Sequence, residues 1–196
     1  PAIYTLSLHD ALPVSVMNLE LAGDYRAQWG EGPIWWGDSL YYVDIEGHKV
    51  LRYDPVSNTE ESWEVGERVG TVVPRREGGL VIAGDSGFSF LDPASGALTP
   101  LGDPEPDKPD NRVNDGKCSP DGRFFAGTIS LVKKKGDAAL YRLDPNQEIH
   151  KVYDGVTNSC GIVWTADGCT VLYIDTPRLA VLAFDYDASA GTLSNE

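Results

Sequence analysis

The sequence predicts an all-β protein whose strands are arranged in repeats. Three observations support this fold class. No stretch keeps a 3.6-residue apolar period, so helix is expected to be a minor component. Short apolar runs are separated by Gly, Pro, Asp and Asn, which is typical of strands joined by turns. One strand-like unit also occurs four times, with a mean spacing of about 44 residues.

The recurring unit is a short apolar strand that ends in aspartate. It occupies residues 51–55, 89–93, 141–145 and 182–186, and a second apolar run precedes it each time, at 40–44, 80–84, 124–128 and 172–175. Each repeat has room for four antiparallel strands, which is the content of one β-propeller blade. The sequence therefore predicts a β-propeller. The unequal steps between units leave a β-sandwich of irregular hairpins as the alternative.

The chain contains about four such units, and residues 188–195 are expected to be a loop. A propeller closes on itself to avoid open edges, so we expect the chain to be an incomplete fragment. The first sixteen residues share none of the repeat pattern, and the only methionine is Met17. Residues 1–16 are therefore predicted to be a non-native tail and are left out of the fold prediction.

Composition narrows the choice of partners. The 196 residues contain 16 Lys plus Arg against 30 Asp plus Glu, a formal net charge of −14. This balance argues against nucleic acid and anionic membranes, which need a basic surface, and it is compatible with a hard cation. No apolar run approaches the ~20 residues that span a bilayer. Three cysteines without metal or disulfide spacing predict a reduced, cytoplasmic protein, and nothing indicates an obligate protein partner.

The polar segment NRVNDG at 111–116 is the strongest candidate for a binding site. Its arginine offers a rigid fork of donors, and its two asparagines offer donors and acceptors. This combination suits a polyhydroxylated or carboxylated small molecule. A surface turn is the alternative, because Asn, Asp and Gly are common in turns for backbone reasons alone.

Four motifs together resemble one known family. They are GEGPIW at 30–35, NRVNDGK at 111–117, SPDGRFFAGT at 119–128, and YIDTP at 173–177 followed by AFDY at 183–186. In order and spacing the chain resembles the gluconolactonase/regucalcin (senescence marker protein) family of sugar lactonases, which are six-bladed β-propellers. The resemblance implies that residues 17–196 form the N-terminal two thirds of such a propeller, a fragment of about four blades.

The resemblance also implies one divalent cation (Ca²⁺, Zn²⁺, Mg²⁺ or Mn²⁺) on the propeller axis, held by a Glu, an Asn and an Asp. The Glu corresponds to Glu31. Cys160 occupies the position of the Asn, and a thiol suits zinc better than calcium or magnesium. Asn158, two residues earlier, is the alternative donor, because alternate residues of a strand face the same side. The Asp, which is also the implied catalytic base, would lie beyond residue 196.

The implied activity is hydrolysis of sugar lactones such as gluconolactone, with Arg112 and Asn114 at the substrate-contacting positions. The family's acidic substrate contact is missing after Thr128, where the sequence continues ISLV, so substrate preference is expected to differ. The 196-residue chain alone is expected to be inactive. A non-catalytic propeller that binds calcium or another ligand is the main alternative. A propeller hydrolase of phosphoesters or aryl esters is less favoured, because no axial histidine is evident.

Overall fold

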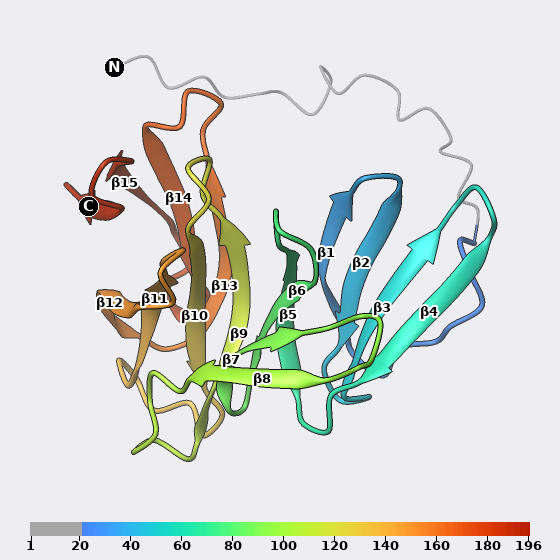
Figure 1. Ribbon diagram of the computed structural model, residues 1–196. Helices are drawn as coiled ribbons and strands as arrows, with labels where there is room; N and C mark the ends of the chain where they lie inside the picture. Colours follow the sequence, from blue (N-terminus) through green and yellow to red (C-terminus); the bar gives the residue numbers. More distant parts are fainter. Residues whose placement is uncertain (1–20) are drawn as a thin grey trace, which may run out of the picture.

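The computed structural model describes residues 21–196, and the predicted tail at 1–16 lies outside the described residues. The described chain folds into four separate four-stranded antiparallel sheets that follow one another along the sequence (Figure 1). Each sheet is a simple meander of consecutive strands, and no strand is exchanged between sheets. This order excludes the β-sandwich alternative and confirms the predicted all-β, bladed architecture, with four blades in the described residues.

The strands of each blade are numbered along the chain. Blade one contains β1 (Gly30–Trp36), β2 (Ser39–Asp44), β3 (Lys49–Asp54) and β4 (Thr59–Glu64). Blade two contains β5 (Val69–Pro74), β6 (Leu80–Gly84), β7 (Gly87–Leu91) and β8 (Leu98–Gly102). Blade three contains β9 (Asn111–Cys118), β10 (Phe124–Ser130), β11 (Ala138–Leu143) and β12 (Ile149–Val156). Blade four contains β13 (Ser159–Trp164), β14 (Thr170–Asp175), the 3₁₀ turn η1 (Thr176–Arg178), β15 (Val181–Asp187) and β16 (Thr192–Ser194).

The predicted loop at 188–195 was wrong in part, because β16 forms there and pairs with β15. The Asp187 side chain accepts a hydrogen bond from the Ser189 N–H, and the Gly191 N–H donates to the Asp187 carbonyl. These bonds close a hairpin turn that returns the chain to the sheet. A three-residue strand of mixed polarity has too little apolar pattern to be recognised in the sequence.

The first strands of neighbouring blades lie next to one another. Strand β5 contacts both β1 and β9, and β9 also contacts β13. The four blades therefore form an arc, and these four first strands line its inner side (Figure 1). A Cβ atom added to Gly70 of β5 would lie 2.1 Å from the Asn114 carbonyl oxygen of β9. Only glycine permits this approach between the backbones of the second and third blades.

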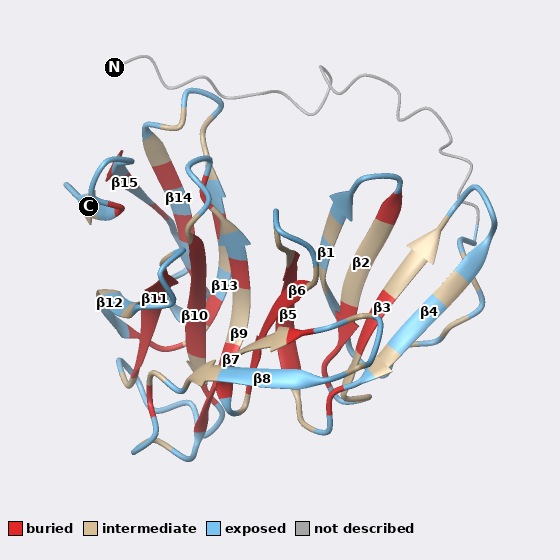
Figure 2. Cartoon of the chain, viewed as in Figure 1, coloured by how far each residue is buried: buried red, intermediate tan, exposed pale blue. Residues whose placement is uncertain are grey.

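The core lies between the blades. One cluster joins blades one and two, a second joins blades two and three, and a third joins blades three and four. Phe124 belongs to the second cluster and Phe125 to the third, because successive strand residues point to opposite faces of the sheet. Blade three is therefore covered on both faces, and β10 and β11 are almost wholly buried (Figure 2).

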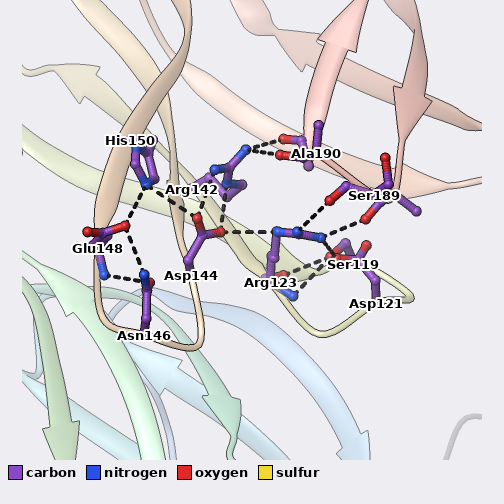
Figure 3. A network of polar contacts seen from close by, with 12 residues as sticks. Ser119, Asp121, Arg123, Arg142, Asp144, Asn146, Glu148, His150, Ser189 and Ala190 are labelled. Carbon is purple, nitrogen blue, oxygen red and sulfur yellow. Dashed lines mark hydrogen bonds and ion pairs between the residues drawn. The ribbon is translucent and has the colours of Figure 1, made fainter.

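A polar network on blade three holds the outer hairpin of blade four (Figure 3). Arg123 donates to the carbonyl oxygens of Ala188 and Ser189, at 2.8 and 3.2 Å. Arg142 donates to the carbonyl oxygens of Ala190 and Gly191 in the same turn, at 2.9 and 2.5 Å. Asp144 lies between the two guanidinium groups and pairs with both. Within residues 21–196, no helix is long and apolar enough to cross a membrane.

Candidate functional site

All four inner strands carry an irregularity where they pass the end of the second strand of their blade. The pairing shifts between Glu31 and Ile34, between Val69 and Thr71, between Val113 and Gly116, and between Ser159 and Gly161. Such bulges redirect side chains and are common beside active sites. Every site residue predicted from the sequence lies at one of these bulges or within two residues of one.

Three of the four loops that lead into the inner strands are fixed by an aspartate of the same blade. Asp44 accepts hydrogen bonds from the N–H groups of Gln28 and Trp29, both at 2.9 Å. Asp175 accepts from the N–H groups of Thr157 and Asn158, at 3.2 and 2.8 Å. In blade two, Asp85 accepts from the Arg68 N–H at 3.1 Å. Blade three differs, since Asn111 Nδ2 donates to the buried Glu105 carboxylate at 2.8 Å.

Glu31 lies on β1 and is exposed, and its carboxylate forms no hydrogen bond or ion pair with the described residues. The bulge that follows it contains Gly32, whose φ of +58° favours glycine, and Pro33. Glu31 borders a cavity of about 150 Å³ between β1, β5 and β9. Its carboxylate is therefore available to a ligand from the inner side of the arc.

Asp115 of β9, for which no substrate or metal contact was predicted, borders the same cavity. Burial raises the pKa of its carboxyl group above the ordinary value; the Gly116 N–H and Lys117 lower it, and Glu31 raises it. Two carboxylates separated by 84 positions in the sequence thus face one small cavity. This concentration of negative charge favours a cation.

Arg112 and Asn114 lie together on β9, as the spacing of the motif led us to expect. Arg112 is 8% exposed, and its Nη1 donates to the Val113 carbonyl oxygen and to Asn114 Oδ1, both at 2.9 Å. Asn114 Nδ2 donates to the Ser159 carbonyl oxygen of β13 at 2.6 Å. The pair is therefore held rigidly between the third and fourth blades.

The surroundings of Arg112 are mixed in charge. Burial is the main reason that the pKa of its guanidinium is lowered, and the positive charge of Arg68 acts in the same direction. This pKa is raised, in contrast, by the negative charges of Asp85, Glu46 and Glu31. These groups come from blades one and two, so Arg112 lies within electrostatic range of both blades. Sequence spacing gave no sign of Arg68 and Asp85 at this site.

Cys160 and Asn158 occupy different local environments. Cys160 is exposed at the bulge of β13, whereas Asn158 precedes the strand and forms an isolated bridge with Ile129. The bulge interrupts the alternation of side chains between the two faces of the strand. The spacing of two residues between Asn158 and Cys160 therefore does not by itself place their side chains on the same face. Asn158 Oδ1 is buried and has no hydrogen-bond partner among the described residues. A buried acceptor without a protein partner is available to water, a ligand or an ion.

The donors present fit a hard cation better than zinc. The described residues contain no group of three or more His, Cys, Asp or Glu that could hold a metal ion. At the positions predicted to hold the cation, the Glu31 carboxylate and Asn158 Oδ1 are oxygen donors without protein partners among the described residues. Ca²⁺ and Mg²⁺ prefer such oxygen ligands, whereas the Cys160 thiol suits softer metals. The donors at these two positions therefore fit an oxygen-coordinated divalent cation better than zinc.

A comparison with protein families gives a match over residues 29–196 to the family described as the SMP-30/Gluconolactonase/LRE-like region. The chain belongs to this family. The match includes every site residue named above and begins just before β1. Membership agrees with the resemblance that the motifs carried, and it confirms that the four sheets are blades of a β-propeller.

Curated relatives in this family are regucalcins. Regucalcin from Danio rerio is 41% identical over 186 residues, and the match covers 93% of this chain and 63% of the relative. Regucalcin from Homo sapiens is 34% identical over 189 residues, with the same shares covered. The chain thus spans a little under two thirds of the length of these family members.

Solved structures of similar fold agree with this assignment. The calcium-binding protein regucalcin from Agrobacterium tumefaciens superimposes with a TM-score of 0.81 at 23% identity, over 87% of this chain and 58% of that chain. A gluconolactonase from Xanthomonas campestris gives a TM-score of 0.73 at 22% identity, over 87% of this chain and 62% of that chain. A luciferin-regenerating enzyme gives a TM-score of 0.79 at 27% identity, over 86% of this chain and 59% of that chain. The similarity to the Agrobacterium and Xanthomonas proteins concerns the fold alone.

Proposed function

We propose that the protein to which this chain belongs hydrolyses sugar lactones with the help of one divalent cation. Family membership supports a lactonase, since a gluconolactonase is among the structures of the same fold. The oxygen donors at Glu31 and Asn158 favour Ca²⁺ or Mg²⁺ over Zn²⁺, and Mn²⁺ remains a candidate. The likeness to a calcium-binding regucalcin makes Ca²⁺ the first ion to test.

The observation that carries the proposal is the rigid Arg112–Asn114 pair. A hydrogen bond of 2.9 Å joins the two side chains, and Asn114 is anchored to β13 at 2.6 Å. Fixed donors of this kind orient a polyhydroxylated ring without losing side-chain freedom when the ring binds. Arg112 would bind oxygen atoms of the substrate through its free N–H groups, and Asn114 would keep the guanidinium in position. This pairing suits substrate binding better than it suits a structural core.

The remaining residues divide the chemistry between them. Glu31 and Asn158 would hold the cation, together with donors from the rest of the protein. When bound, the cation would polarise the lactone carbonyl and stabilise the oxyanion that develops on it. Activation of the attacking water is assigned to the family aspartate that the resemblance places beyond residue 196. For that reason we expect the 196-residue chain alone to give no turnover.

The test uses the full-length protein, freed of metal with a chelator and then loaded with each candidate cation. Hydrolysis of gluconolactone is followed in a pH-stat as acid release. We expect activity only with metal, and a loss of at least about a hundredfold in kcat/KM for Glu31→Gln. The matched control is Glu77→Gln, whose side chain is 85% exposed. Equal activity of Glu31→Gln and the wild type would reject the proposed role of Glu31.

A non-catalytic propeller that binds a cation or another ligand is the second candidate. The observation in its favour is Cys160, which stands where the family resemblance implies an asparagine ligand. It predicts that the full-length protein binds Ca²⁺ but releases no acid from any lactone. A small-molecule partner, without nucleic acid, membrane or an obligate protein partner, remains a prediction in both cases.

A further inference from the structure

We propose that the lactone bound by this protein carries a carboxylate, and that this carboxylate binds the free edge of the Arg112 guanidinium. The inference rests on the proposed lactonase function and narrows its substrate class. It concerns a sugar lactone in which a terminal hydroxymethyl group is replaced by an acid.

Arg112 is a buried cation without an anionic partner. It is 8% exposed, and none of the ion pairs of the described residues includes it. Other partly buried arginines are paired: Arg68 with Asp85, Arg123 with Asp121, and Arg142 with Asp144. Buried charges are ordinarily paired, because removing an ion from water is costly without compensation. A bound anion would supply the missing partner.

The donors left free have the geometry of a carboxylate site. Nη1 makes both hydrogen bonds that Arg112 forms with the described residues. Nε is buried without a partner, and Nη2 forms no hydrogen bond with the described residues but is not among the fully buried atoms. The N–H groups of Nε and Nη2 point from the same edge of the guanidinium plane. That edge matches the two oxygens of one carboxylate.

Neighbouring acids do not occupy this edge. Asp85 is engaged with Arg68, through Arg68 Nη2 to Oδ1 at 3.0 Å and Arg68 Nε to Oδ2 at 3.1 Å. Glu46 is exposed and forms no ion pair with the described residues, and Glu31 is the proposed cation ligand. Glu31, Glu46 and Asp85 thus contribute to the field around Arg112 without bonding to it.

The residue directly opposite Arg112 in the sheet is apolar. Ile129 of β10 pairs with Arg112 in the register of β9 and β10, and Ser130 pairs with Asn111. Residues 129–132 contain no acid, so this strand leaves the positive charge of Arg112 without a neighbour of opposite sign. A neutral hydroxyl could accept a hydrogen bond from Nε or Nη2, but it would leave the buried charge unpaired. A substrate carboxylate satisfies both the donors and the charge.

The experiment compares two lactones on the full-length, metal-loaded protein. The 1,4-lactones of gluconic and glucaric acid share one ring and differ only at C6, which is a hydroxymethyl group or a carboxylate. We expect kcat/KM to be at least about tenfold higher for the glucaric lactone. Arg112→Gln should remove that preference, and Arg112→Lys should restore part of it. Arg52→Gln, a surface residue of β3 paired with Glu61, is the control and should leave it unchanged.

Calorimetry with the open-chain products provides a second readout that needs no turnover. We expect glucarate to bind more tightly than gluconate, the difference to shrink at high salt, and Arg112→Gln to abolish it. Equal kcat/KM for the two lactones, with equal losses in Arg112→Gln, would overturn the carboxylate assignment and leave the lactonase proposal intact. Failure to hydrolyse either of these or any other lactone would instead overturn the proposed function.

Discussion

Asn114 of β9 donates a hydrogen bond of 2.6 Å to the Ser159 carbonyl oxygen of β13. This bond joins the bulge of the third blade to the bulge of the fourth. Asn114 also accepts from Arg112, so one carboxamide links the proposed substrate arginine to the strand that carries Cys160. Hydrogen bonds through Asn114 therefore join Arg112, which is proposed to bind the substrate, to the segment that contains Asn158, a proposed cation ligand.

Replacing Asn114 should weaken both the fold and the site. Asn114→Ala leaves one Arg112 N–H and the Ser159 carbonyl without their partners, which should lower the free energy of unfolding by about 1 to 3 kcal/mol. It should also raise KM for the lactone, because Arg112 loses its orientation. Urea denaturation and steady-state kinetics of the full-length protein measure the two effects. Asn146→Ala in the exposed β11–β12 turn is the control, and an Asn114→Ala variant with unchanged KM would contradict this role.

Asn158, rather than Cys160, is expected to contribute to Ca²⁺ binding. Its Oδ1 is buried and unpartnered, whereas a thiol is a poor ligand for a hard cation. Calorimetry should show that Asn158→Ala weakens Ca²⁺ binding by about tenfold or more and that Cys160→Ala changes it by less than about twofold. Cys160→Asn should tighten it. The reverse order of the two alanine variants would assign the cation to the position of Cys160.

Acid should release the loop that leads into β1. Burial raises the pKa of the Asp44 carboxyl group, but hydrogen bonds from the Trp29 and Gln28 N–H groups, with others, lower it overall. The pKa of this group is lower in the folded state than the value of about 3.9 that it has in the unfolded chain. It therefore stabilises the fold fully at pH values above about 3.9, and this stabilisation is lost as pH falls through the pKa of the folded state.

The corresponding variant is Asp44→Asn. It should reduce stability at neutral pH and flatten the decline of stability below about pH 4, because the titrating group is gone. Thermal unfolding as a function of pH measures both effects, and Asp38→Asn in the exposed β1–β2 turn is the control. If Asp44→Asn loses stability at low pH as steeply as the wild type does, Asp44 does not cause this loss.

The interface of blades three and four depends on Phe125. Its side chain is fully buried and packs edge-on against Trp164 and Tyr186, with ring centroids at 5.1 and 5.9 Å. Phe125→Ala should lower the free energy of unfolding by about 3 to 5 kcal/mol, since it leaves a cavity between the sheets. Urea denaturation measures this loss, with Val56→Ala, at an 88% exposed position, as the control. A loss below about 1 kcal/mol would mean that the blades repack around the gap.

The strands of the blades could be predicted because each third strand is an apolar run that ends at or beside an aspartate, and another apolar run precedes it in every blade. The bulges could not, because alternation assumes an unbroken ladder, and the relation between Asn158 and Cys160 depends on one of these breaks. The motif NRVNDG places Arg112 and Asn114 two residues apart, but the hydrogen bond between their side chains is visible only in the structure. The approach of Asp115 to Glu31 depends on how β1 and β9 lie in space, and no local pattern contains that information.

The aspartates that fasten the inner-strand loops have a consequence for how this site can change. Asp44, Asp85 and Asp175 each bind the loop of their own blade through backbone N–H groups. Backbone bonds make no demand on side-chain identity, so a ligand position beside such a loop can be replaced without loosening it. Three of the four described blades thus hold their own loop independently, and a cysteine at position 160 leaves the bonds from the Thr157 and Asn158 N–H groups to Asp175 in place.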